Sequence, residues 1–239
     1  MTQALTVSNV SYSVAGLDIL RKLDLEVGAQ QYYAIAGVNG AGKSTLIKLI
    51  LDLIRPQPGG RIRIFDFENS NPQCREQLAY LPEKFDVKKN ISGRQYLDFI
   101  AAAYHQKPDR SKIAELAERL DFPPDRLDNR VGGYSKGMVQ KLGLLSCFML
   151  DRRLIILDEP LSGLDPRARY HFKELMRSLR SSEHTVLYST HLLADAEDLC
   201  DQFGILHDGE MKYRGTPAEC MQRYQADSLE NAYMACIAS

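Results

Sequence analysis

Long apolar runs are missing from this sequence. No stretch approaches the ~18 consecutive apolar residues that a membrane-spanning helix requires. The first ten residues are too short in apolar run and too poor in basic residues for a secretory signal peptide. We therefore expect no part of the chain to cross a membrane.

Cysteine pairs and an excess of charge of one sign are missing too. The five cysteines are odd in number and have no C-x-x-C spacing, so the sequence predicts neither a zinc site nor a disulfide framework. The 30 Lys and Arg residues nearly cancel the 31 Asp and Glu residues, so no overall positive field favours nucleic acid or anionic lipid. With 44% hydrophobic and 26% charged residues, the composition is that of a globular protein with reduced thiols and a sizeable core.

The order of the apolar segments favours an α/β fold. Helices are predicted from Lys43 and over 168–179, and an inserted helical lobe is predicted between Pro82 and about Leu150, where apolar residues recur every three or four positions. The alternation of strands and helices on both sides of this insert predicts a mostly parallel sheet. Strands are predicted at 5–10, 23–27, 32–36, 61–65, 154–157, 185–188 and 203–206.

A glycine-rich turn follows the buried strand predicted at 32–36 and opens a helix. Its residues match the pattern G-x-x-x-x-G-K-[ST] of a phosphate-binding P-loop. Glycines let backbone N–H groups face phosphate oxygens, and the helix N-terminus adds partial positive charge. Lys43 is expected to reach the β and γ phosphates, and Ser44 to bind Mg²⁺. The predicted nucleotide-binding residues are Gly37, Asn39, Gly40, Ala41, Gly42, Lys43, Ser44 and Thr45. The alternative is a glycine loop that only tightens a turn.

Two carboxylates end the apolar strand predicted at 154–157. Parallel strands deliver such groups to the edge of the sheet that also carries a P-loop. Asp158 is therefore expected to hold Mg²⁺, directly or through water, and Glu159 to polarise the water that attacks the γ phosphate. Without the P-loop, the pair could equally be an acidic cap on a core strand.

The order of these and further motifs resembles the nucleotide-binding subunit of an ATP-binding cassette (ABC) transporter, from about Leu5 to Glu219. Residues 134–138, Tyr-Ser-Lys-Gly-Met, stand where that family has its Leu-Ser-Gly-Gly-Gln signature. Residues 161–165 resemble the family's D-loop, and residues 189–191 its switch histidine. The resemblance implies nucleotide contacts for Ser135, Gly137 and Asp165, a catalytic role for His191 with Lys43 and Glu159, and adenine stacking for Tyr12.

Each of these residues also has a structural interpretation. Ser135 and Gly137 could simply cap a helix. Asp165 could be a turn or cap residue before a proline, and this role is compatible with a nucleotide contact. His191 could be an ordinary solvated histidine, although its place after a strand brings its ring toward the γ phosphate. An aromatic such as Tyr12 near a strand end usually belongs to core packing.

Two positions depart from the family pattern. Glu83 replaces the glutamine of the family's Q-loop, so a carboxylate stands near the expected metal. Lys136 and Met138 replace a glycine and a glutamine of the signature. Both variants resemble those of subunits that serve exporter-type permeases, and they incline the prediction toward export.

The resemblance also implies an architecture and partners. It implies one ABC ATPase domain, 1–239, with antiparallel N-terminal strands, a RecA-like P-loop NTPase core at 1–82 and 151–220, a helical subdomain at about 83–150 and a tail at 221–239. The end of the tail is expected to be a small docking or frayed segment. Two such subunits, identical or paralogous, are expected to close on ATP and Mg²⁺ and to drive a separate transmembrane permease from the cytoplasmic, inner face of the membrane.

The rival interpretation is a soluble ABC-type ATPase that remodels DNA, ribosomes or another assembly. Such proteins usually add a coiled coil, a zinc hook or a second cassette, and none is visible in the sequence. The balanced charge also gives no nucleic-acid footprint. A plain P-loop kinase or GTPase is a more distant alternative, which the signature, the acidic pair and His191 disfavour.

Overall fold

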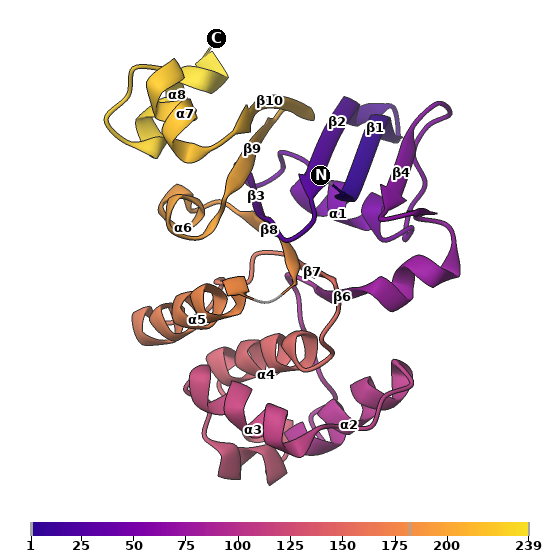
Figure 1. Cartoon of the computed structure of the whole chain (residues 1–239), viewed down its shortest axis with the longest axis vertical. Coiled ribbons are helices and arrows are strands. Elements are labelled where there is room, and N and C mark those ends of the chain that lie inside the picture. Colours follow the sequence, from indigo (N-terminus) through magenta and orange to yellow (C-terminus); the bar gives the residue numbers. More distant parts are fainter. Residues whose placement is uncertain (1, 182, 239) are drawn as a thin grey trace.

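Two β-sheets form the centre of the molecule (Figure 1). The computed structural model describes residues 2–181 and 183–238. The larger sheet has the strand order β10-β9-β3-β8-β7-β6, and the smaller sheet the order β2-β1-β4-β5. The strands are β1 (Gln3–Val14), β2 (Leu17–Gly28), β3 (Tyr32–Ala36), β4 (Arg61–Ile64), β5 (Phe67–Glu68), β6 (Leu78–Leu81), β7 (Leu154–Leu157), β8 (Thr185–Thr190), β9 (Gln202–His207) and β10 (Glu210–Gly215).

The larger sheet is parallel except for its edge strand β10, which runs antiparallel to β9. Its central strand β3 is buried at all five positions because both faces are covered. Tyr33 and Ile35 face the core shared with helix α1 (Lys43–Ile50) and the smaller sheet. Ala34 and Ala36 face the core shared with the helices of the other side. The predicted mostly parallel sheet is therefore confirmed.

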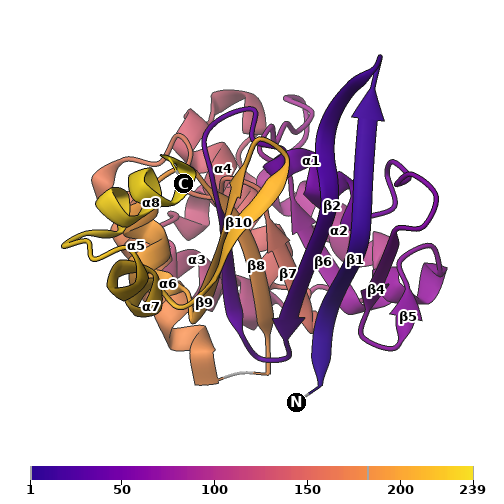
Figure 2. The same cartoon turned by 90° about the horizontal axis from the view of Figure 1, so that it is seen from above.

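The antiparallel N-terminal sheet is also present, but its first two strands are longer than predicted. The sequence predicted 5–10 and 23–27, whereas β1 and β2 pair along 12 residues each. The outer half of this hairpin carries exposed residues such as Val14 and Leu17, 51% and 70% exposed. A segment without a buried face gives no apolar alternation, so its backbone pairing leaves little trace in the sequence. Figure 2 shows the two strands side by side along their length.

Three helices and short 3₁₀ turns follow β6 and lie together at one end of the molecule, apart from the antiparallel sheet (Figure 1). They are α2 (Gly93–Ala103), α3 (Arg110–Arg119) and α4 (Lys136–Phe148). Side chains cap all three: Ser92 forms a capping box with Gln95, while Asp109 and Ser135 accept hydrogen bonds from the first turns of α3 and α4. Every residue of α4 from Gln140 to Phe148 is buried. This helix therefore joins the lobe to the sheet.

Of the two alternatives predicted for the C-terminal tail, a small docking segment or a frayed one, the structure agrees with the docking segment. After helices α5 (Pro166–Ser178) and α6 (Leu193–Leu199), the chain forms α7 (Pro217–Arg223) and α8 (Leu229–Ala238). The α8 residues Leu229, Ala232 and Cys236 are buried in the main core. Because these buried residues recur at three- and four-residue intervals, one face of α8 packs against the core.

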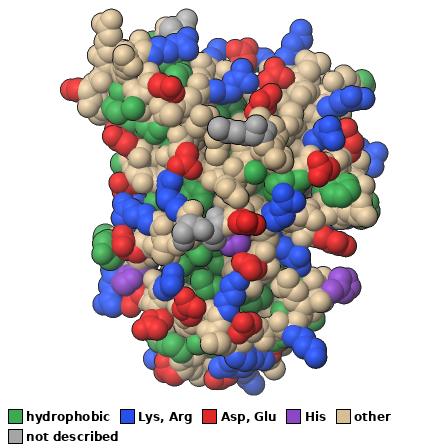
Figure 3. All heavy atoms as spheres, in the orientation of Figure 1, with side chains coloured by type: hydrophobic (Ala, Val, Ile, Leu, Met, Phe, Trp, Pro, Cys, Tyr) green, Lys and Arg blue, Asp and Glu red, His purple; other side chains and the backbone are tan. Residues whose placement is uncertain are grey.

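Charge is spread evenly over the visible surface. Figure 3 shows acidic and basic side chains intermixed over the face that it presents. Within residues 2–181 and 183–238, no helix is both long enough and apolar enough to cross a bilayer.

Candidate functional site

The P-loop leaves β3 and curls around the N-terminus of α1. Gly37 lies so close to the end of β9 that a Cβ atom built on it would be 2.4 Å from the backbone oxygen of Leu206. Gly42, the N-cap residue of α1, has a φ of 108°, and a Cβ there would meet Leu20 at 2.7 Å. Both positions therefore require glycine, one for space and one also for its backbone conformation.

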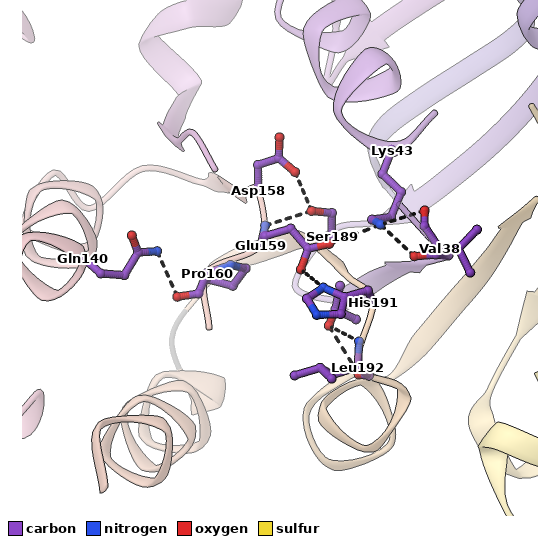
Figure 4. Close-up of polar contacts among 11 residues, drawn as sticks. Val38, Lys43, Gln140, Asp158, Glu159, Pro160, Ser189, His191 and Leu192 are labelled. Atoms are coloured by element: carbon purple, nitrogen blue, oxygen red, sulfur yellow. Dashed lines mark hydrogen bonds and ion pairs between the residues drawn. The ribbon is translucent and has the colours of Figure 1, made fainter. Parts of the chain in front are cut away.

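Lys43 begins α1 and is buried, with 6% of its side chain exposed. Its ammonium group donates hydrogen bonds to the carbonyl oxygens of Gly37 at 2.7 Å and Val38 at 3.3 Å. It also forms an ion pair with Glu159 Oε1 at 3.2 Å. The P-loop and the end of β7 are thus joined by a buried charge pair (Figure 4).

The two acidic residues at the end of β7 both hydrogen-bond with one serine that the sequence analysis did not select, Asp158 through its carboxylate and Glu159 through its backbone N–H. Ser189 Oγ donates to Asp158 Oδ1 at 2.5 Å and accepts from the backbone N–H of Glu159 at 2.9 Å. Ser189 is fully buried and belongs to β8, which lies beside β7 in parallel register with Leu157 opposite Tyr188. The next residues along each strand, Asp158 and Ser189, are therefore neighbours, so the parallel pairing itself was the available signal.

His191, in the loop after β8, contacts the carboxylate of Glu159. Its Nδ1 lies 2.7 Å from Glu159 Oε2. A carboxylate oxygen only accepts, so this ring nitrogen carries the hydrogen and donates it. Glu159 itself has a φ of 50°, in the left-handed region that non-glycine residues seldom adopt. Its two carboxylate oxygens are thus directed at different partners, Lys43 and His191.

A cavity of about 500 Å³ opens over these residues. It brings together predicted site residues from the P-loop, the Q-loop, the end of β7 and the loop after β8. Three of its residues, Ile19, Val38 and Ser162, were not among the predicted site residues. The lining comprises Ile19, Val38, Asn39, Gly40, Gly42, Lys43, Ser44, Thr45, Glu83, Glu159, Ser162 and His191.

The residues at the cavity fit a magnesium-bound nucleotide. Among the described residues, no group of three or more His, Cys, Asp and Glu side chains could hold a metal without further ligands. Mg²⁺ in nucleotide sites is typically held by one or two protein groups together with phosphate oxygens and water, and Ser44 and Glu83 line the cavity. Burial, together with the charges of Asp158 and Glu83, raises the pKa of Tyr80 to about 12. The negative charge at this edge is suited to a cation.

Seven predicted residues lie outside the cavity lining: Gly37, Ala41 and Asp158, which adjoin lining residues in the sequence, and Ser135, Gly137, Asp165 and Tyr12, which lie on other elements. Ser135 is the N-cap of α4 and accepts a hydrogen bond from Met138 N, and Gly137 is in the first turn of that helix. Asp165 caps α5 by accepting from Ala168 N at 2.7 Å. Tyr12 is on β1, where it packs against the core beneath the antiparallel sheet. Their cap and packing interpretations are thus visible within one chain, while their predicted nucleotide contacts remain predictions.

Gln140 is another residue that the sequence analysis missed. It lies in α4, one turn after Gly137, and its side-chain amide donates to the backbone oxygen of Pro160 at 3.0 Å (Figure 4). Pro160 directly follows Glu159. In the structure Gln140 is buried, with 7% exposure, but in the sequence it stands beside Lys141 in a helix of mixed character, so nothing marked it. This hydrogen bond fixes the loop after Glu159 to the helix that Ser135 opens.

Comparisons with known proteins agree with this geometry. A family model described as ABC transporter matches residues 20–162. The chain is 32% identical to an ABC transporter ATP-binding protein of Nostoc sp. over 205 residues, 84% of this chain and 61% of that protein. It is 30% identical to the daunorubicin resistance ATP-binding protein DrrA3 of Streptomyces coeruleorubidus over 231 residues, 95% of this chain and 72% of that protein.

A solved structure of the ATP-binding subunit of an ABC transporter superposes with a TM-score of 0.88 and 31% sequence identity, over 98% of this chain and 99% of that one. The predicted P-loop fold with an antiparallel N-terminal sheet is thereby confirmed. The chain spans about three fifths of the length of the Nostoc relative. The family model and the superposition together show that this chain belongs to the ABC transporter family, among its ATP-binding subunits.

Proposed function

We propose that this chain hydrolyses ATP to power export through a separate membrane permease. The observation that carries this proposal is the convergence of Lys43 and His191 on the two carboxylate oxygens of Glu159, at distances of 3.2 Å and 2.7 Å. A carboxylate held between a phosphate-binding cation and an N–H donor is placed to act as a general base next to a phosphate.

The chemistry follows from these contacts. When the Lys43 ammonium turns to the β and γ phosphates, it leaves Glu159 Oε1, which then has no hydrogen-bond donor. That oxygen accepts a proton from a water molecule, whose oxygen bonds to the γ phosphorus as the bond to ADP breaks. His191 keeps Oε2 in place through its Nδ1–H. Bound Mg²⁺ would neutralise charge on the phosphates, and Ser44, Asp158 and Glu83 are the residues proposed to hold it.

We propose further that each site is shared between two copies of the chain. Ser135 is exposed at the start of α4, and a Cβ atom on Gly137 would meet only Gly163 O at 3.8 Å and Ser135 Oγ at 4.0 Å. Glycine destabilises a helix by about 1 kcal/mol relative to alanine, and nothing within the chain requires it here. The close approach of a phosphate bound to a second copy would explain why this position has no side chain.

A mixing experiment tests the shared site. Lys43→Ala inactivates the P-loop of one chain, and Gly137→Asp places a carboxylate where the second copy's phosphate is proposed to sit. Each variant alone is expected to lose ATPase activity, whereas a mixture of the two is expected to regain part of it. In the mixed pair, the P-loop of the Gly137→Asp chain faces the intact Ser135 and Gly137 of the other chain.

The measurement is steady-state phosphate release after the two purified variants are mixed in several ratios. Activity should be greatest near equal amounts and should vanish at either extreme. A mixture as inactive as its separate components would show that each site is complete within one chain.

The proposal of export rests on two features. Glu83 and the Tyr134–Met138 variant resemble those of subunits that serve exporters, and one relative is named for resistance to daunorubicin. The nearly balanced charge of the sequence, and the acidic and basic side chains intermixed on the face shown in Figure 3, favour a permease partner at the inner face of the membrane over nucleic acid.

Affinity purification from detergent-solubilised membranes tests the permease. We expect the chain to be recovered with a polytopic membrane protein, and the recovered complex to hydrolyse ATP. Lys43→Ala should be recovered with the same protein but without activity, because Lys43 lies in the nucleotide cavity. Recovery with DNA or ribosomes, and with no membrane protein, would instead support the soluble remodelling ATPase.

A further inference from the structure

The first residue of α4, Lys136, has no evident benefit for the helix that it begins. It directly follows the N-cap residue Ser135, and its side chain is exposed. Because the N-terminus of a helix carries partial positive charge, a cation in the first turn is unfavourable. Lys136 also stands where the signature of the family has a glycine. An explanation for this lysine therefore has to come from outside α4.

The outer part of the Lys136 side chain lies over the loop that follows Glu159. A Cβ atom built on Gly163 would be 2.7 Å from Lys136 Cε and 3.2 Å from both Cδ and Nζ of the same side chain. Gly163 has a φ of 78°, a conformation that favours glycine. The loop thus presents bare backbone at this position, and the lysine chain occupies the space that a side chain would fill.

A second side chain of α4 contacts the same loop. Gln140 follows Lys136 by four positions, so the two side chains lie one turn apart on one face of the helix. The Gln140 amide donates to the backbone oxygen of Pro160 at 3.0 Å (Figure 4), while Lys136 covers Gly163. Helix α4 therefore holds the loop at two points, by one hydrogen bond and by one contact of an aliphatic chain.

This loop carries two residues of the nucleotide cavity. Glu159 begins it, and both Glu159 and Ser162 line the cavity. The backbone N–H of Ser162 donates to the backbone oxygen of Glu159 at 3.0 Å, so the two residues belong to one turn. Gly163 directly follows this turn. A contact that restrains Gly163 therefore also restrains the backbone that places Glu159 and Ser162.

We propose that Lys136 is a positioning residue of the reaction centre: its aliphatic chain covers Gly163 and holds the turn 159–162 in place. The chain of a lysine can cover a surface in this way while its ammonium group stays in water. This inference rests on the proposed function only in taking Glu159 as the base. It gives the lysine in the signature a role within its own chain.

Two substitutions separate the aliphatic chain from the charge. Lys136→Ala removes the chain, whereas Lys136→Met keeps an unbranched chain as far as the Cε position and removes the ammonium group. In the nucleotide-free protein, we expect Lys136→Ala to speed amide exchange in a peptide covering 157–166 by about three- to tenfold, the equivalent of one or two buried methylene groups. It should lower kcat by a comparable factor, with KM for ATP nearly unchanged because the P-loop is intact. Lys136→Met should keep exchange and kcat near their wild-type values.

The matched control is Lys112→Ala, the same change in the first turn of α3 in the helical lobe. Lys112 pairs with Asp151 at 3.0 Å and is not among the residues that line the cavity, so exchange in 157–166, kcat and KM should all stay at their wild-type values. Wild-type exchange of this peptide in the Lys136→Ala protein would overturn the inference. A Lys136→Met protein as impaired as Lys136→Ala would overturn it as well, because the charge would then be the part that acts. Exchange is measured without nucleotide, so a wild-type protein that does not hydrolyse ATP would count against the proposed function alone.

Discussion

Replacing Glu159 by glutamine is expected to slow ATP hydrolysis by about 10²- to 10⁴-fold, the usual contribution of a general base, while ATP still binds. Glutamine keeps the size of the side chain and can still contact Lys43 and His191, but its amide cannot take the proton of the attacking water. Because the γ phosphate then persists, the ATP-bound pair of chains should accumulate.

Single-turnover hydrolysis and size-exclusion chromatography with ATP and Mg²⁺ measure the two effects. The control is Glu197→Gln, the same change at an exposed position of α6, which should hydrolyse ATP at the wild-type rate. Undiminished turnover in the Glu159→Gln protein would remove Glu159 from the role of base. Slow turnover without an accumulated dimer would contradict the proposal of a shared site, but it would leave the role of Glu159 as base intact.

Replacing Lys43 by alanine is expected to weaken ATP binding by about 10- to 100-fold, the range for a hydrogen bond to a charged group. The ammonium group is directed into the cavity from the first turn of α1, and no neighbouring side chain replaces its charge there. The change also leaves Glu159 buried, 10% exposed, without its cation. Uncompensated buried charge is unfavourable, so thermal stability should fall as well.

Equilibrium titration with ATP, made below the unfolding temperature of each protein, separates affinity from stability. Lys48→Ala, at an exposed position in the last turn of α1, serves as the matched control and should bind ATP as the wild type does. Tight ATP binding by the Lys43→Ala protein would contradict the assignment of the P-loop.

Much of the fold could be predicted because the larger sheet is buried on both faces. Its strands β3 and β7 read as continuous apolar runs and β8 has an apolar centre, and a predicted site residue follows each strand directly. The P-loop could be predicted for a different reason. Its glycines and Lys43 act through local backbone geometry, so their spacing in the sequence is fixed. Strand order and local spacing together were enough to predict that Lys43, Glu159 and His191 would meet.

What could not be predicted depends on contacts distant in sequence. Ser189 holds Asp158 through strand pairing, and Gln140 reaches Pro160 across 20 residues of sequence. Neither residue belongs to a pattern with a characteristic spacing. The length of the β1–β2 hairpin and the packing of α8 were missed because backbone pairing and a short apolar face both give weak periodic signals.

The hydrogen bond between Gln140 and Pro160 has a consequence for a working pair of chains. Ser135 lies at the N-terminus of α4, where it faces the nucleotide of the neighbouring chain in the proposed arrangement. Gln140 of the same helix hydrogen-bonds to Pro160, which follows the proposed base Glu159 of its own chain. In that arrangement, the hydrogen bond would connect the end of α4 that faces one nucleotide with the loop beside the proposed base of the other site. The two sites of such a pair would then hydrolyse ATP in a coordinated order and not independently of each other.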